Sequence, residues 1–368
     1  MDLLKTTESP IIIAVTGSAG KTTTKEMISA IVKQRGSIFK TMYNLNLPHH
    51  TAKYAGQINS THYAAVLEYA LSKPGHINMH CELLKPHIGV ITNIGSAHIG
   101  RFDGDMTKLV EGKGELIEGL HQQGMVVINQ DDPYSQLLNT ESFTGKIVKV
   151  GMVHSADYQA EKVNYSDKGM TFEVRIDGFL HRFEIPLFGT HNVYNALCAI
   201  AVGHHLGFSI EELAKGLRNF SRPARRIQVR KLADEMLLID DSFSSNPHAA
   251  KAALDVLSHL GTGLKVALLG SMLELGNYSV QGHQEIGRYV KEKDIDWLYL
   301  YGKAALEIGK AAAEAGFPTS KIKHFKTKNE LHQQLEQISQ PGMTLLIKGS
   351  HALKLYETAN FMKVKFRI

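Results

Sequence analysis

Cysteine, tryptophan and long apolar runs are all scarce in this sequence. Among its 368 residues the only cysteines are Cys81 and Cys198, and there is a single tryptophan. Two cysteines exclude a disulfide framework and favour a reducing compartment, so we expect a cytoplasmic protein. No apolar run approaches the roughly 20 residues of a membrane-spanning helix, and no charged-then-apolar leader opens the chain. We therefore expect neither a membrane span nor a secretory signal.

A strong charge of either sign is also missing. The chain has 41 Lys and Arg against 36 Asp and Glu, a net charge of +5. The basic residues are scattered and lack interleaved aromatic residues, which argues against nucleic acid as a partner. The mild positive charge suits a polyanionic small molecule such as a nucleotide, and it equally suits ordinary solubility.

What the sequence does contain is a phosphate-binding loop near its start. The apolar run Ile11–Val15 leads into Thr16-Gly17-Ser18-Ala19-Gly20-Lys21-Thr22-Thr23, after which the residues favour a helix. A buried strand that delivers a glycine-rich turn to a helix N-terminus directs backbone N–H groups at phosphate. The lysine adds charge for the β and γ phosphates, and the Thr22 hydroxyl can ligate Mg²⁺. Val15 replaces the first glycine of the full P-loop signature, so a strand–turn–helix corner with a chance lysine is the alternative.

The pattern over residues 1–222 predicts a P-loop α/β domain. Buried strands are expected at 11–15, 64–68, 88–92 and 124–128, and helices at 23–33, 108–120, from 191 and at 209–217. Residues 146–186 alternate in polarity without a helical period. The fold expected is a mostly parallel sheet with a small antiparallel addition.

A proline and a basic cluster at 221–226 mark the predicted domain boundary, so the second domain is expected over 223–368. Its strands are expected near residues 236, 265, 297 and 343. They alternate with helices at 247–259, 279–292, 303–315 and 328–338. This alternation predicts a smaller, Rossmann-like α/β domain.

Polar residues follow several predicted strands. Glu68 ends one strand, and His98 follows the next, with Lys113 fifteen residues further on. The ligand of an open α/β sheet lies beyond the carboxyl ends of its strands, so these residues converge on the phosphate loop. Each residue alone is ordinary for a surface or a strand end.

Two further groups are candidates. Asn44 and Asn46 can point amides at a transferring phosphoryl group, or they simply form a turn before Pro48. Asp241 ends the first strand expected in the second domain, where it can accept ribose hydroxyls or cap the next helix.

Taken together and in order, these motifs resemble the Mur ligase family of ATP-dependent enzymes that form amide bonds. The resemblance runs from Ile11 to about Glu357. It rests on the phosphate loop, Glu68, His98, Lys113-Gly114-Glu115, Gly189-Thr190-His191-Asn192-Val193-Tyr194-Asn195-Ala196, Asp240-Asp241-Ser242, Met272-Leu273-Glu274-Leu275-Gly276 and Lys348-Gly349-Ser350.

The resemblance implies a role for each matching residue. The ATP phosphates would be held by Gly17, Ser18, Ala19, Gly20, Lys21, Thr22 and Thr23. Thr22 and Glu68 would bind one Mg²⁺; His98 and Lys113 would serve a second, with Lys113 as a carbamate. Asn192 and Asn195 would contact adenine. Arg226, rather than Arg225, and Asp241 would reach the γ-phosphate and ribose regions when the second domain closes. Lys21, Lys113, His98, Asn44 and Arg226 are the catalytic candidates.

The implied reaction joins a small-molecule carboxylate to an amine through an acyl phosphate, with release of ADP and phosphate. Two departures bear on the substrate. Only ten residues precede the first strand, so the family's UDP-gripping N-terminal domain is expected to be absent, which favours a carboxylate not presented on UDP. In addition, Asn44-Leu45-Asn46 runs directly into Leu47-Pro48, shortening the family's asparagine segment.

Two alternatives remain at this point. One is a peptidoglycan-precursor ligase that adds D-alanyl-D-alanine and obtains UDP recognition elsewhere. The other is a nucleotide-binding or ATPase subunit that has lost ligation. Retention of Glu68, His98 and Lys113 argues against the second, since a binding module has little use for a second metal site.

Overall fold

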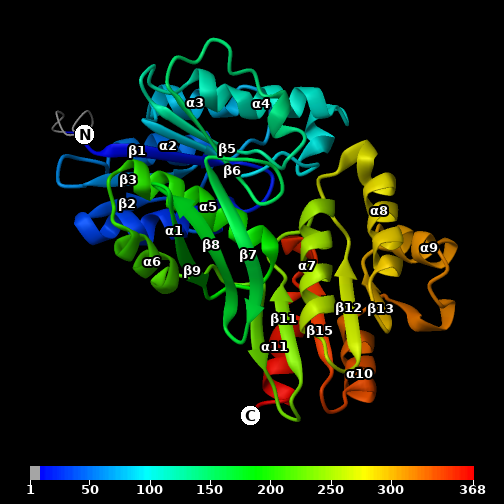
Figure 1. Cartoon of the computed structure of the whole chain (residues 1–368). Helices are drawn as coiled ribbons and strands as arrows, with labels where there is room; N and C mark the ends of the chain where they lie inside the picture. The colour runs from blue at the N-terminus through cyan, green and yellow to red at the C-terminus, as the bar shows by residue number, and fades with distance from the viewer. Residues whose placement is uncertain (1–8) are drawn as a thin grey trace. The chain divides into compact units, whose positions relative to one another are not determined.

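Strand β1 (Ile11–Thr16) lies inside a nine-stranded sheet in the computed structural model, which describes residues 9–368 (Figure 1). The strand order is β2-β3-β1-β4-β5-β6-β7-β8-β9, parallel from β2 to β7 and antiparallel from β7 to β9. The other strands are β2 (Ile38–Lys40), β3 (Ala64–Glu68), β4 (Ile88–Ile91), β5 (Met125–Asn129), β6 (Lys146–Gly151), β7 (Tyr158–Ser166), β8 (Gly169–Ile176) and β9 (Phe179–Ile185). Strands β2 and β3 lie on one side of β1, and β4 and the later strands lie on the other. The strand order therefore switches sides at β1, and open α/β sheets bind their ligands at such a switch point.

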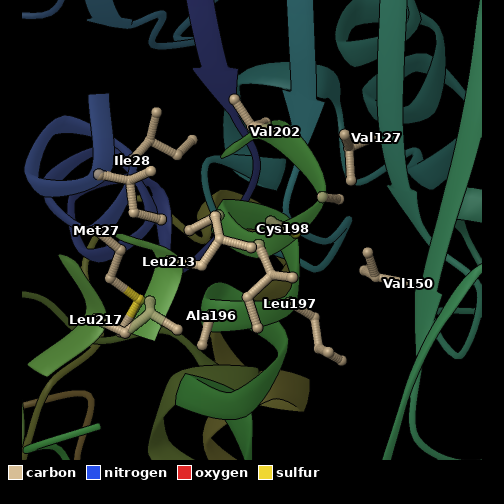
Figure 2. Packing of buried hydrophobic residues seen from close by; sticks show 14 of the residues in the cluster. Met27, Ile28, Val127, Val150, Ala196, Leu197, Cys198, Val202, Leu213 and Leu217 are labelled. Atoms are coloured by element: carbon tan, nitrogen blue, oxygen red, sulfur yellow. The ribbon is translucent and has the colours of Figure 1, made fainter. Parts of the chain in front are cut away.

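Helices cover both faces of this sheet (Figure 1). On one side are α1 (Lys21–Val32), α5 (Thr190–His205) and α6 (Ile210–Asn219); on the other are α3 (His76–Leu83) and α4 (Met106–Glu118). A further helix, α2 (Pro48–Ala55), packs on α3. Figure 2 shows how Met27 and Ile28 of α1 meet α5 and α6, while Val127 and Val150 of the sheet meet α5 from the other side. Apolar burial on this scale supplies the main stabilisation of the unit.

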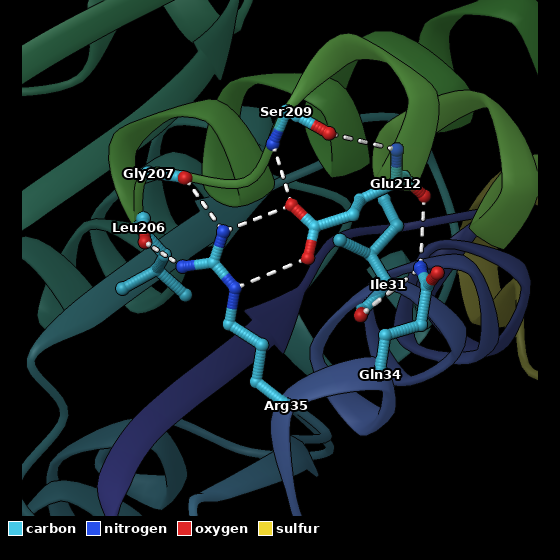
Figure 3. A network of polar contacts seen from close by, with 7 residues as sticks. All are labelled: Ile31, Gln34, Arg35, Leu206, Gly207, Ser209 and Glu212. Carbon is cyan, nitrogen blue, oxygen red and sulfur yellow. Dashed lines mark hydrogen bonds and ion pairs between the residues drawn. The ribbon is translucent and has the colours of Figure 1, made fainter.

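The end of α1 is fastened to α5 and α6 by one polar network (Figure 3). Arg35 donates to both carboxylate oxygens of Glu212, at 3.3 and 2.9 Å, and to the carbonyls of Leu206 and Gly207 at the end of α5. Ser209 and Glu212 form a capping box at the start of α6. The ion pair raises the pKa of Arg35 and lowers the pKa of Glu212.

The second sheet has six strands in the order β10-β11-β15-β12-β13-β14, parallel except for the β10–β11 pair. Its strands are β10 (Gln228–Lys231), β11 (Leu237–Asp241), β12 (Lys265–Gly270), β13 (Trp297–Tyr301), β14 (Ile322–Phe325) and β15 (Thr344–Lys348). Its helices are α7 (Pro247–Leu260), α8 (Ser279–Glu292), α9 (Leu306–Glu314), α10 (Lys328–Ile338) and α11 (Tyr356–Lys365). Side chains of α10 and α11 pack with this sheet in a separate core.

The chain divides into two compact units. One holds the residues up to His98 together with Asp105–Pro223, and the other holds Ile99–Gly104 and Ala224–Ile368. Within residues 9–368, every helix is too short or too polar to traverse a lipid bilayer. Both cysteines are buried free thiols, and burial raises the pKa of each to about 12.

The predicted fold class is confirmed, including the antiparallel addition, but the sequence prediction omitted six elements. These are β2, β10, β14, α2, α3 and α11. Two of the strands lack a readable apolar period for a physical reason: β2 has only three residues, and β10 is the polar edge segment Gln-Val-Arg-Lys. Helix α1 begins at Lys21, two residues before the predicted start, so the lysine and Thr22 belong to its first turn.

We expect Arg35→Ala to lower the free energy of unfolding by about 1–2 kcal/mol, because it removes two charged contacts and two helix-end contacts together. Chemical denaturation at pH 7 measures this. The folded-state pKa of Glu212 lies below 4.5, so the difference from wild type is fully present above pH 4.5 and shrinks as the pH falls through the folded value. Arg218, whose guanidinium lies 3.8 Å from Glu184, is the control: Arg218→Ala should cost no more than about 0.5 kcal/mol. An equal loss of unfolding free energy in both variants would contradict the stabilising role assigned to the contacts of Arg35.

Candidate active site

The phosphate loop between β1 and α1 is packed too closely for any side chain at its glycines. Gly17 has a φ of +143° and Gly20 a φ of +82°. A Cβ atom would lie 2.0 Å from the Thr92 hydroxyl at the first position and 2.3 Å from Asn195 Oδ1 at the second. Left-handed backbone and close approach together demand glycine here. The N-terminus of α1 has no side-chain cap and no acidic residue in its first turn, which leaves its dipole available to an anion.

The loop is held by the segment that follows β4. Ser18 donates to the Gly95 carbonyl at 2.7 Å and accepts from the Gly95 N–H at 2.9 Å. The Ala19 N–H donates to Asn93 Oδ1, and Thr92 donates to the Ala19 carbonyl. The loop shape is therefore set by the protein itself. Lys21 donates to the Gly17 carbonyl at 2.8 Å, which curls its side chain back over the loop.

Thr22 and Glu68 meet at the carboxyl end of β3, as the sequence predicts for two ligands of one ion. The Thr22 hydroxyl donates to Glu68 Oε2 at 3.0 Å, and the Asn46 amide donates to Glu68 Oε1 at 2.9 Å. Two adjacent ligands of an octahedral Mg²⁺ at about 2.1 Å are themselves about 3.0 Å apart. The observed oxygen pair therefore fits a magnesium ion.

A buried lysine, Lys25, helps to hold the backbone of Glu68 through Thr41. Lys25 is 1% exposed and donates to the Thr41 carbonyl at 2.6 Å, while its charge is paired with Glu26 at 3.0 Å. The Thr41 hydroxyl accepts the backbone N–H of Glu68 at 2.9 Å. The backbone of Glu68 is thus tied to α1, the helix that also carries Thr22.

Lys113 on α4 is the third buried lysine of interest, and its surroundings differ from those of the others. Lys25 and Lys348 have carboxylates at 3.0 and 2.5 Å; Lys113, 1% exposed, has no carboxylate within ion-pair distance among residues 9–368. Burial lowers its pKa well below the usual value, the charge of Lys21 lowers it further, and Asp132 offsets part of this. Burial and the neighbouring charge therefore favour the neutral amine of Lys113 over the ammonium.

His98 and the two asparagines of α5 take different positions. His98 is half-buried and has a left-handed backbone, with φ +64°. Asn192 and Asn195 are each 3% exposed; Asn195 donates to Asn192 Oδ1 and accepts from the Thr24 hydroxyl. Their amides thus join α5 to α1 directly behind Gly20. The predicted contact with adenine stays a prediction.

In the second unit, the predicted residues surround the end of β11. Asp241 pairs with Lys348 at 2.5 Å and accepts the Ile227 N–H at 3.2 Å. Burial raises the pKa of Asp241, and Lys348, Arg226 and the Ile227 N–H oppose this. The Arg226 guanidinium lies 4.5 Å from the centroid of the Phe243 ring.

The structure brings Thr22, Glu68 and Asn46 into contact, whereas Asn44 is exposed in the turn before them. The supporting residues Lys25, Thr41 and Lys348 were not among the predicted site residues. The burial of a lysine within a helix, as for Lys25, gives no signal in a single sequence. Within residues 9–368 no group of three or more His, Cys, Asp or Glu could hold a metal ion, so a magnesium ion here depends on Thr22 and on phosphate oxygens for its other ligands.

Comparison with known protein families gives a match for each of the two units. Residues 15–203 match the Mur ligase middle domain, and residues 225–351 match the Mur ligase, glutamate ligase domain.

Individual relatives match nearly the whole chain. The chain is 34% identical over 347 residues to the UDP-N-acetylmuramoyl-tripeptide–D-alanyl-D-alanine ligase of Bacillus subtilis, covering 94% of this chain and 74% of that one. The enzyme of the same name from Synechocystis is 31% identical, with 94% and 72% covered. Among solved structures, MurF from Acinetobacter baumannii superposes with a TM-score of 0.87 at 29% identity, covering 96% of this chain and 76% of that one.

We expect Gly20→Ala to abolish nucleotide binding, because the new Cβ would lie 2.3 Å from Asn195 and displace the loop. Gly75 is a matched control: it also caps a helix, α3, at a φ of +81°, but a Cβ there meets nothing within 4 Å. Gly75→Ala should cost only about 1 kcal/mol of backbone strain. Titration with ADP and thermal unfolding of both variants measure the difference. Wild-type affinity in Gly20→Ala would show that the loop does not bind phosphate.

Proposed function

The chain belongs to the Mur ligase family, and from this premise we propose that it joins a small-molecule carboxylate to the amino group of a D-alanyl-D-alanine dipeptide. Family membership confirms the prediction of an ATP-dependent ligase that forms an amide bond. The observation that carries the proposal is the Thr22–Glu68 oxygen pair at the mouth of the phosphate loop. The dipeptide is inferred from the relatives that match almost the whole chain.

In the proposed reaction, an oxygen of the carboxylate substrate attacks the γ-phosphorus of ATP. The bond to the β-γ bridging oxygen breaks, which yields an acyl phosphate and ADP. The dipeptide nitrogen then attacks the acyl carbon and loses a proton as phosphate leaves. Lys21 and the backbone N–H groups of the loop stabilise the charge that develops on the phosphoryl oxygens, with Asn44 as a further proposed contact.

We assign one Mg²⁺ to Thr22 and Glu68 and a second to His98 and Lys113. When bound, the ions neutralise phosphate charge and so ease attack by a carboxylate. An ammonium at position 113 would repel a cation, whereas a carbamate offers hard oxygen ligands. The neutral amine of Lys113 can attack CO₂ and release a proton to give that carbamate. Its lowered pKa, set by burial and by Lys21, supports this assignment.

The remaining assignments follow the family resemblance. Asn192 and Asn195 are proposed for the adenine of ATP, and their position behind Gly20 supports a further role in shaping the loop. Arg226 is proposed for the γ-phosphate and Asp241 for the ribose. The pairing of Asp241 with Lys348 favours the ionised carboxylate, which accepts hydroxyl hydrogens, and so opposes the burial that raises the pKa of Asp241.

ADP release is expected to require both a carboxylate and an amine. D-alanyl-D-alanine should support it and L-alanyl-L-alanine should not, with mass spectrometry detecting the dehydrated adduct. Two acyl donors separate the substrate alternatives: UDP-N-acetylmuramoyl-tripeptide and the same tripeptide without UDP. ADP release at full rate without either substrate would favour a non-ligating ATPase and overturn the proposal.

Lys113→Ala should lower turnover by at least about 100-fold, because it removes the proposed ligand of the second ion. Formate or acetate should restore part of the activity, and ¹³C-labelled bicarbonate should give a carbamate signal in wild type alone. Lys108→Ala, an exposed lysine on the same helix, is the control and should retain full activity. Full activity in Lys113→Ala would remove the residue from the site.

A further inference from the structure

The second unit contains an open hollow of about 520 Å³, within the size range of small-molecule sites. The segment before β10 contributes Arg225, the end of β11 contributes Asp240, and α11 contributes Tyr356, Asn360 and Lys363. None of these residues has a part in the proposed ligation. The hollow is lined by two cationic side chains, one carboxylate, the amides of Gln228 and Asn360, the phenol ring of Tyr356 and the imidazole of His351.

Arg225 is the most unusual of the lining residues. Its guanidinium lies 4.9 Å from the ring centroid of Tyr356 and 5.3 Å from that of Phe243. Among residues 9–368 no carboxylate pairs with it. Its backbone has a φ of +58°, a left-handed conformation that costs energy for any residue with a side chain. The rings hold the guanidinium plane in place, and its N–H edge is left for a ligand.

The other charges of the hollow are already balanced. Lys363 donates to Asp240 Oδ2 at 2.9 Å, and the Ser242 hydroxyl donates to Asp240 Oδ1 at 2.6 Å. Asp240, 1% exposed, therefore has a partner on each oxygen. With Arg225 and Lys363 positive and Asp240 negative, the Arg, Lys and Asp side chains of the lining carry one net positive charge.

We propose that this hollow binds the carboxylate of a small molecule of amino-acid or short-peptide size, with Arg225 as its bidentate partner. One unpaired cation matches one carboxylate, whereas a dianionic phosphate would leave a charge without a partner. The planar guanidinium matches the two oxygens of a carboxylate, and the amide of Asn360 offers a further donor and acceptor. This inference does not depend on the proposed ligation.

The test is calorimetric titration of the full chain without ATP, with three probes: D-alanyl-D-alanine, its C-terminal carboxamide and inorganic phosphate. The free dipeptide should bind, and the carboxamide should bind at least ten-fold more weakly. Phosphate should also bind more weakly than the dipeptide. Because no ATP is present, the result is independent of whether the enzyme ligates these compounds.

Arg225→Gly should weaken dipeptide binding at least ten-fold. Glycine accepts the left-handed backbone, so the variant should melt at the wild-type temperature or above, and lost binding cannot then be ascribed to unfolding. Arg222→Ala removes an exposed arginine three residues away and should bind as wild type does. Three results would overturn the proposal: unchanged affinity in Arg225→Gly, phosphate binding more tightly than the dipeptide, or no dipeptide affinity below a Kd of about 10 mM.

Discussion

The contact between the phosphate loop and its neighbours constrains the rest of the first unit. Gly17 and Gly20 leave no room for a Cβ because Thr92 and Asn195 occupy that space. Thr92 directly follows β4, the strand beside β1, and Asn195 lies on α5, a helix on the sheet's face. The loop can therefore take its shape only when the sheet and α5 are in place. The apolar packing of α5 and the contacts of Arg35 with the carbonyls of Leu206 and Gly207 secure the same helix from its other end.

A second constraint fixes the position of the carboxylate. Glu68 could rotate freely at the end of a strand, yet its two oxygens and its backbone N–H are all engaged, by Thr22, Asn46 and Thr41. Lys25 connects the Thr41 end of this arrangement back to α1. An ion bound between Thr22 and Glu68 would replace one hydrogen bond and leave the supporting contacts intact. The side chains are thus close to the required geometry before any ligand arrives.

The sequence predicted those features that have a local signature. The β1–loop–α1 corner, the helix expected at 209–217 and the alternation of the second unit each depend on residues close together in the chain. Thr22 and Glu68 could be paired because the carboxyl ends of parallel strands meet at one edge. The sequence could not predict that Asn46, and not Asn44, contacts Glu68. Both are asparagines of the same turn, and only the conformation of that turn decides which amide faces the carboxylate. The same holds for Lys25 and Thr41, whose function depends on long-range burial, and for Arg225, whose φ of +58° has no sequence signal.

Lys25, Lys348 and Lys113, three of the buried lysines, show that the charge of the neighbouring group decides the chemistry of a buried amine. Lys25 and Lys348 lie beside carboxylates and can stay protonated, but Lys113 faces the charge of Lys21 and has only the more distant Asp132 to offset it. Its lowered pKa means that the folded state binds fewer protons than the unfolded chain. The contribution of Lys113 to the stability of this unit therefore rises as the pH increases from its lowered folded pKa to about 10.5, the value for an exposed lysine. Carbamylation would convert the repulsion from Lys21 into attraction, because a negative group would then stand beside a cation. A position that disfavours an ammonium and accepts either a neutral amine or an anion is the environment that the proposed second metal ligand requires.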